Sequence, residues 1–273
     1  MKDFQYRSRD GLNLYARLQA PDGDVKGVIG LIHGLGEYGG RYCDVGRVFA
    51  DRGYAFVAGD LRGHGLSQGR RAFAPRLDSF LDDFDRYIAA IRERFPGKPL
   101  FLYAFSMGSP LTAVYLAERQ PHIAGAVLVS GVYMTPLPAK VRALSLIAPT
   151  MAVSNTLGPL REKVCHDVAV LDAYDADSLV YKKITIGLAA IIAEAGRTAL
   201  AHAGEIRTPV LIMHGDADVV AAPEGSKQLA AAVTGDATLK LWPGLYHFLN
   251  FEPGAREHIF PFVTDWCDAH LPK

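Results

Sequence analysis

The stretch PLFLYAFSMG, residues 99–108, joins a run of apolar residues to a serine that has small residues nearby. An apolar run such as Pro99–Phe105 is typical of a strand that is buried on both faces of a sheet. Small residues at Ala104 and Gly108 let a strand and the following helix approach closely, so that Ser106 projects its hydroxyl above the sheet. The stretch predicts a strand, a sharp turn and a helix, with Ser106 as a candidate nucleophile. The alternative is that Ser106 only caps the helix.

Similar apolar runs recur on both sides of this strand and alternate with longer amphipathic segments. That alternation predicts an α/β protein with a mostly parallel, doubly wound sheet and helices on both faces. The expected strands are Val25–His33, Tyr54–Asp60, Pro99–Phe105, Ile123–Ser130, Pro209–Gly215 and Ala237–Trp242, preceded by shorter ones near Phe4–Arg7 and Leu12–Leu18. The expected helices are Asp78–Phe95, Met107–Gln120, Pro223–Val233 and Gly254–His270.

The alternation stops between Gly131 and about Ala203, where the sequence contains no convincing strand. This segment is rich in Ala, Leu and Ile, and it lies between two expected strands. We therefore expect a helical cap (residues 131–203) inserted into a core formed by residues 1–130 and 204–273. An insertion outside the main core needs a reason to be so apolar, which indicates an apolar binding site beneath it.

Composition excludes several classes of protein. Lys plus Arg and Asp plus Glu both number 29, so no net charge draws the chain to nucleic acid or anionic lipid. The 3 cysteines show no CxxC spacing, which argues against a disulfide framework or a zinc ribbon. The first residues lack the apolar core of a signal peptide, and no apolar run is long enough to span a bilayer. We expect a cytoplasmic protein with no nucleic-acid partner; the sequence indicates no oligomeric state.

A second motif, His33-Gly34-Leu35-Gly36-Glu37, ends the first long strand. Acyl transfer through a serine needs two backbone N–H groups directed at the developing oxyanion. One comes from the residue after the nucleophile, and the other from the loop after an earlier strand. Leu35 and Met107 occupy these two positions and are the candidate oxyanion-hole residues. The alternative is an ordinary turn in which His33 satisfies neighbouring backbone groups.

Two later motifs supply an acid and a base. HGDAD (residues 214–218) lies at the end of one strand, and His247 lies in the turn after the last strand. The chain order is therefore Ser, Asp, His, as a serine hydrolase on a doubly wound sheet requires. Asp218 lies further into its loop than Asp216 and is better placed to fold back to His247. We expect Ser106, Asp218 and His247 to be catalytic.

Three alternatives stay open around these residues. Asp216 could cap its own turn through an Asx hydrogen bond. Asp216 and Asp218 could also bind a metal together with His214, although adjacent His and Asp in such loops more often bond to each other, and we expect no metal and no cofactor. In the segment DLRGHGLS (residues 60–67), His64 is a rival base, but it precedes Ser106 and is more simply a structural histidine. In the same segment we expect Asp60 and Arg62 to form an ion pair.

Five motifs together resemble the monoacylglycerol lipase and lysophospholipase branch of the α/β-hydrolases. They are HGLGEYGGRY (33–42), DLRGHGLSQG (60–69), FSMGS (105–109), HGDADVV (214–220) and GLYHFLNFE (244–252). The resemblance implies the α/β-hydrolase fold, with Ser106 as nucleophile, His247 as base and Asp218 as acid. It also implies that the amides of Leu35 and Met107 form the oxyanion hole. Ala104 and Phe105 depart from the Gly-His that usually precedes the serine in this family.

The resemblance implies that the chain hydrolyses esters through an acyl-enzyme. An apolar cap favours a monoester of an apolar acyl chain with a small polar alcohol such as glycerol, as in a monoacylglycerol or lysophospholipid, and a transient contact of the cap with a membrane or micelle. We expect Ile186 and Ile191 to face that acyl chain. The alternatives are a carboxylesterase for short or aromatic acyl groups, a peptidase for small peptides, and a binding protein without catalysis. The intact set Ser106, Asp218 and His247 argues against the last.

Overall fold

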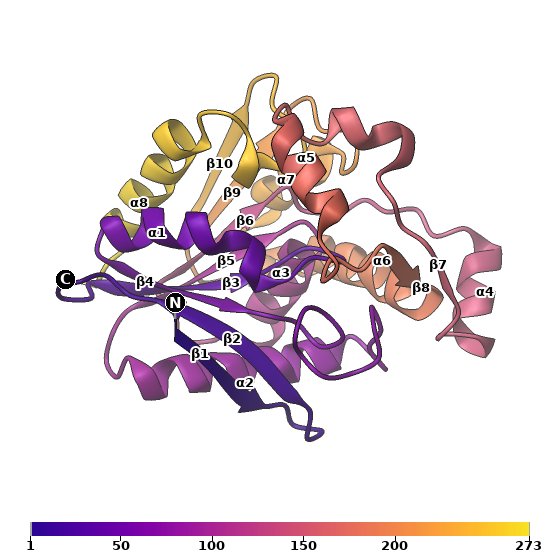
Figure 1. Cartoon of the computed structure of the whole chain (residues 1–273), viewed down its shortest axis with the longest axis horizontal. Helices are drawn as coiled ribbons and strands as arrows, with labels where there is room; N and C mark the ends of the chain where they lie inside the picture. The colour runs from indigo at the N-terminus through magenta and orange to yellow at the C-terminus, as the bar shows by residue number, and fades with distance from the viewer. Residues whose placement is uncertain (1, 273) are drawn as a thin grey trace.

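The computed structural model describes residues 2–272 and contains an eight-stranded sheet with helices on both faces (Figure 1). Across the sheet the strands follow the order β1-β2-β4-β3-β5-β6-β9-β10, in which β1, β2 and β4 pair antiparallel and the rest pair parallel. The strands are β1 (Lys2–Arg7), β2 (Asn13–Gln19), β3 (Gly27–Ile32), β4 (Tyr54–Gly59), β5 (Leu100–Phe105), β6 (Gly125–Val129), β9 (Val210–Gly215) and β10 (Ala237–Trp242). The predicted doubly wound α/β class is confirmed.

Two layers of helices enclose this sheet. Helices α1 (Cys43–Asp51) and α8 (Phe260–Ala269) cover one face, and α2 (Asp78–Arg94), α3 (Gly108–Arg119) and α7 (Pro223–Ala232) cover the other. Each layer packs its own apolar cluster against the sheet, and strand β5 contributes to both. Leu102 and Ala104 pack with α2 and α3, whereas Phe101, Tyr103 and Phe105 pack with α1 and α8. This alternation follows from the two-residue period of a strand, and it explains why β5 is apolar throughout.

The sequence located these elements closely. Every strand expected in the main sheet begins and ends within two residues of its prediction, and α2, α3 and α7 do so as well. Helix α1 was not predicted. The helix expected at Gly254–His270 starts as a short π-helical segment, Ala255–Ile259, and continues as α8. Short 3-10 turns lie at Gly39–Tyr42, Gly158–Lys163, Ala203–Glu205 and Leu249–Phe251.

The cap contains more than helices. It carries α4 (Ala139–Ile147), α5 (Val168–Ala176) and α6 (Ile186–Ala201), and also an antiparallel pair of strands, β7 (Ala152–Ser154) and β8 (Lys183–Thr185). The expectation of a segment without strands is therefore wrong. All three residues of β7 are exposed, so this strand leaves no apolar run in the sequence.

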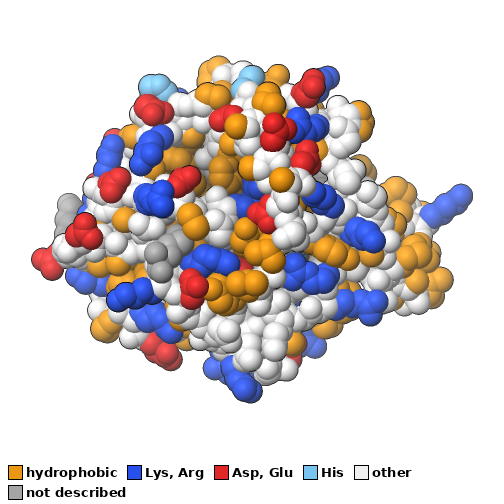
Figure 2. All heavy atoms as spheres, in the orientation of Figure 1, with side chains coloured by type: hydrophobic (Ala, Val, Ile, Leu, Met, Phe, Trp, Pro, Cys, Tyr) orange, Lys and Arg blue, Asp and Glu red, His pale blue; other side chains and the backbone are white. Residues whose placement is uncertain are grey.

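The cap helices differ in how they attach to the rest of the molecule. Helix α6 packs against α3, and its Leu188, Ile192 and Ala195 belong to the main apolar cluster. Helix α4 buries none of its residues, and its Leu146 and Ile147 are 82% and 81% exposed. Figure 2 shows apolar side chains on the protruding end of the molecule, where Figure 1 places α4. No helix within residues 2–272 is long and apolar enough to cross a bilayer.

The winding of the sheet reverses at its centre. The chain passes from β3 to β4 on one side of β3 and later crosses to β5 on the other side. The loops that leave the carboxyl ends of β3 and β5 therefore diverge, and ligands bind in the crevice that such a reversal opens. These two loops carry Leu35 and Ser106.

Candidate active site

Ser106 lies in a tight turn between β5 and α3. Its φ of 52° falls in the left-handed region, which is uncommon for a residue with a side chain and is found where the surroundings enforce it. The Ser106 N–H donates to the carbonyl of Val129 at 2.9 Å, which fixes the turn to β6. A Cβ at Gly108 would lie 2.4 Å from the carbonyl oxygen of Ile32, so only glycine permits this approach. The methyl of Ala104, where the family usually has glycine, is fully buried in the core.

The structure brings the three predicted catalytic residues together. His247 Nε2 lies 2.9 Å from Ser106 Oγ, and His247 Nδ1 lies 2.7 Å from Asp218 Oδ2. All three residues are buried. Because a carboxylate only accepts, His247 Nδ1 carries the proton and Nε2 is free to accept the proton of the serine hydroxyl.

Four hydrogen bonds hold the Asp218 carboxylate. Oδ1 accepts from the amides of Val220 and Ala221 at 2.7 and 3.0 Å, and Oδ2 accepts from His247 and from His214 Nε2 at 2.9 Å. Burial raises the pKa of Asp218, but the charge of His247 and these hydrogen bonds outweigh it and hold the pKa well below its usual value. The carboxylate therefore stays ionised beside His247. The bond from His214 agrees with the expectation that adjacent His and Asp of this loop bond to each other.

Asp216 and His214 each form a hydrogen bond with a residue of another segment of the chain. Asp216 Oδ1 accepts from the backbone N–H of Gly244 at 2.6 Å, across to the loop that leads to His247, and not from its own turn. His214 Nδ1 faces the hydroxyl of Ser226 at 2.7 Å. Within residues 2–272, no three His, Cys, Asp or Glu side chains are grouped as metal ligands.

Leu35 and Met107 both line the cavity onto which Ser106 opens. His33 fixes the first of these loops. Its Nε2 lies 2.9 Å from the backbone N–H of Leu61, which can only donate, so the ring proton is on Nδ1 and donates to the carbonyl of Gly34 at 2.7 Å. In a trans peptide the carbonyl and the next N–H point in opposite directions. Holding the Gly34 oxygen therefore sets the direction of the Leu35 N–H.

His64 supports His33 and does not contact Ser106. Its ring packs edge-on against His33 with 5.2 Å between ring centroids, and its Nδ1 donates to the carbonyl of Arg62 at 2.9 Å. Burial lowers the pKa of His33 to about 4 and that of His64 to about 3, so both rings are neutral at neutral pH. The structural interpretation of His64 agrees with this geometry.

The expected ion pair between Asp60 and Arg62 does not form. Arg62 instead binds Asp83 on helix α2, with Nε–Oδ2 and Nη2–Oδ1 distances of 2.6 and 2.7 Å. Asp60 accepts from Arg17 at 2.9 Å and from the Gly39 amide at 2.7 Å. The prediction failed because each side chain finds a partner that is distant in the sequence.

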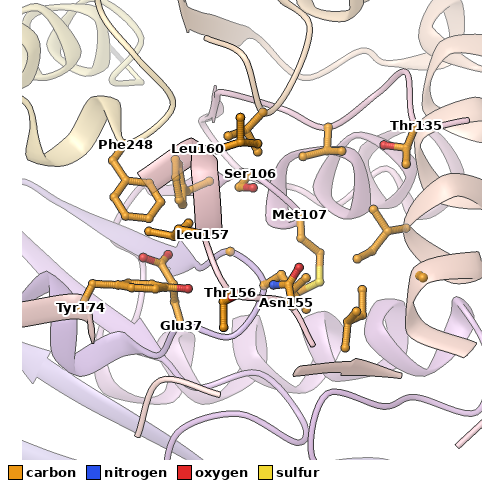
Figure 3. Close-up of a pocket in the computed structure, with 18 of the residues that line it drawn as sticks. Glu37, Ser106, Met107, Thr135, Asn155, Thr156, Leu157, Leu160, Tyr174 and Phe248 are labelled. Carbon is orange, nitrogen blue, oxygen red and sulfur yellow. The ribbon is translucent and has the colours of Figure 1, made fainter. Parts of the chain in front are cut away.

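A cavity of about 420 Å³ opens beside Ser106 (Figure 3). Its walls are mostly apolar and come from the β5–α3 turn, the loop after β3 and the cap. Ile184, Ala189 and Ile192 of the cap contribute to the lining, whereas Ile186 and Ile191 do not. The expectation for Ile186 and Ile191 is therefore wrong, because the apolar run is helical and only one of its faces meets the cavity.

One acidic side chain of the cavity was not predicted as a site residue. Glu37 is buried, and its carboxylate accepts from Arg41 Nε at 3.1 Å and from the Tyr42 hydroxyl at 2.9 Å. Polar side chains of Thr135, Asn155 and Thr156 also line the cavity. Glu37 stands two residues after Leu35 in the motif HGLGE, and that spacing could have drawn attention to it.

The fold and the Ser-Asp-His order define an α/β-hydrolase. The chain belongs to the serine aminopeptidase S33 family, whose sequence profile matches residues 23–254. It is 32% identical over 270 residues to a monoacylglycerol lipase of Mycolicibacterium smegmatis, a match that covers 96% of this chain and 95% of that protein.

Two further similarities support the same family. The structure of a monoacylglycerol lipase of Paleococcus ferrophilus superimposes with a TM-score of 0.84 at 27% identity, over 94% of this chain and 99% of that one. An uncharacterised abhydrolase domain-containing protein of Dictyostelium discoideum is 32% identical over 250 residues, which are 88% of this chain and 26% of that longer protein. The chain is thus a serine ester hydrolase of the lipase and esterase type.

Proposed function

We propose that the protein hydrolyses lipid monoesters of the monoacylglycerol or lysophospholipid type through an acyl-enzyme on Ser106. His247 takes the proton of the serine hydroxyl as Ser106 Oγ attacks the ester carbonyl. Asp218 orients His247 and stabilises its cationic form. The amides of Leu35 and Met107 donate to the oxyanion of the tetrahedral intermediate. His247 then protonates the leaving alcohol and afterwards activates the water that releases the acid.

One observation carries this proposal: Ser106 Oγ, 2.9 Å from His247 Nε2, lies in the wall of a mostly apolar cavity of about 420 Å³. Burial of an acyl chain in such a cavity is favourable by about 0.8 kcal/mol per methylene. The buried carboxylate of Glu37 and the side chains of Asn155 and Thr156 place polar groups on the same cavity. A monoester with one apolar and one polar end fits this lining, and two similar proteins are monoacylglycerol lipases.

We also propose that residues 131–203 act as a cap over the site and contact lipid transiently. Leu146 and Ile147 on α4 are exposed, as are Met151, which follows α4 in the chain, and Leu160, which also lines the cavity. Apolar side chains next to a cavity entrance favour contact with a lipid surface, from which a monoester could enter without crossing water.

Labelling and an ester panel test this function. A fluorophosphonate should label the wild-type protein and not Ser106→Ala. Glyceryl monoesters and lysophospholipids of graded chain length should be hydrolysed with a kcat/KM that rises from acetate to medium chains. If acetyl or aromatic acyl esters are the best substrates, the carboxylesterase alternative replaces this proposal, and preferential cleavage of small peptides would favour the peptidase. Labelling without turnover of any ester would favour the binding protein.

A further inference from the structure

A short segment of the cap, residues 164–166, bonds to the loop that carries His247. The backbone N–H of Phe248 donates to the carbonyl of Val164 at 2.7 Å. The thiol of Cys165 lies 3.4 Å from the carbonyl of Phe251. Val164 and Cys165 are both buried. The cap therefore contacts the catalytic loop directly.

Glu252 is at the centre of this junction. Its side chain is fully buried, and its Oε1 accepts from the backbone N–H of Tyr246 at 2.9 Å. Its Oε2 accepts from His166 of the cap twice, from the backbone N–H at 3.1 Å and from Nδ1 at 2.9 Å. Within the described part of the chain, no Lys or Arg forms an ion pair with Glu252. A buried carboxylate without such a partner depends on its N–H donors, so losing one of them disturbs the others.

The cap residue His166 also contacts Tyr246 directly. The His166 ring stacks on the Tyr246 ring with 4.0 Å between centroids and 7° between planes. Tyr246 directly precedes His247. The contacts of its N–H and its ring therefore fix the backbone that leads into His247. Neither Glu252 nor His166 contacts Ser106 or lines the cavity beside it.

We propose that Glu252 and His166 are positioning residues for His247, and that they make the position of the base depend on the position of the cap. This inference rests on the proposed role of His247 as the base. Glu252 holds Tyr246 through Oε1 and the cap through Oε2, so that one carboxylate transmits a displacement of the cap to the loop. A displacement of about 1 Å at a catalytic group can lower kcat about 100-fold.

Four variants separate the contacts. Glu252→Gln keeps an oxygen for the N–H of Tyr246 and removes the charge. Glu252→Ala removes the bonds to Tyr246 and to His166 together. His166→Phe keeps the stack and loses the Nδ1 donor, and His166→Asn keeps a donor near the Nδ1 position. The matched control is Glu205→Gln, because Glu205 forms an exposed pair with His202 at 2.8 Å, away from the site.

The readouts are kcat for p-nitrophenyl acetate and octanoate and the rate of Ser106 labelling by a small fluorophosphonate. We expect Glu252→Gln and His166→Phe to lower all three by the same factor, about 10-fold, with little change in the KM of acetate. Glu252→Ala should lower them about 100-fold, His166→Asn should recover part of the loss, and Glu205→Gln should have no effect.

Two results would overturn the inference. A loss confined to octanoate would mean that the junction holds only the cap, and unchanged kcat in Glu252→Gln and both His166 variants would mean that it is only structural. The His166 variants keep the test decisive if Glu252→Ala does not fold, since the side chain of His166 is 43% exposed. Hydrolysis by Ser106→Ala would instead contradict the proposed function itself, whereas inactive Ser106→Ala beside unchanged Glu252 variants contradicts this inference alone.

Discussion

Acidification should destabilise the fold through His33 and His64. These two buried rings pack against each other, and His33 holds the loop that carries Leu35. Burial lowers the pKa of His33 to about 4 and that of His64 to about 3, from an ordinary value of 6.5. Below pH 6.5 the unfolded chain therefore binds protons that the folded chain excludes, and the free energy of unfolding falls with pH. Above pH 6.5 neither ring contributes. At pH 4.5, about two units below the ordinary value, each excluded proton costs about 3 kcal/mol.

The variant His64→Phe isolates one of the two rings. It keeps a ring against His33 and cannot bind a proton, so its free energy of unfolding should fall about 3 kcal/mol less than that of the wild type between pH 7 and 4.5. Urea unfolding followed by circular dichroism measures how the free energy of unfolding of each protein changes with pH. Groups that titrate alike in the two proteins cancel in the difference between these changes. His202→Phe, at an exposed histidine, is the control. Equal slopes in wild type and His64→Phe would refute the assignment of neutral buried rings.

Four further outcomes are expected. Ser106→Ala and His247→Ala should each lower kcat at least about 1000-fold in single-turnover assays, and the double variant should be hardly worse because the residues act as a unit. Asp218→Asn should be severe and Asp216→Asn mild, since Asp216 bonds only a loop amide; the reverse ranking in kcat would move the acid to Asp216. Ile192→Thr should flatten the rise of kcat/KM with chain length, about fourfold per methylene, while acetate hydrolysis persists. EDTA should leave ester hydrolysis unchanged, and a loss restored by zinc would contradict the serine mechanism.

The central strands could be located from the sequence because their residues are buried on both faces. β5, for example, is a continuous apolar run that ends at Ser106. The order of Ser106, Asp218 and His247 was equally visible, because each residue follows a strand that ends at the same edge of the sheet. Strand β7 was not visible, since its three residues are exposed and pair only with another short strand.

The partners of charged side chains were the least predictable part. Arg62 binds Asp83 and not the nearer Asp60, a choice that depends on where helix α2 packs. The junction of His166 with Glu252 joins residues 86 apart, and neither residue type nor spacing indicates it. Contacts of this kind follow from the folded arrangement, so they become visible only once the fold is known.

The packing of α6 against α3 has a consequence for how substrate enters. Since α6 shares the main apolar cluster, it cannot swing away without opening the interior of the protein, at a cost comparable to unfolding. None of the residues of helix α4 is fully buried, so displacing this helix costs less than displacing α6. Access to Ser106 should therefore be controlled by the part of the cap that precedes α6. This part would move relative to α6, which stays in place. Substitutions on α4 could then alter which esters enter without weakening the fold that holds the catalytic residues.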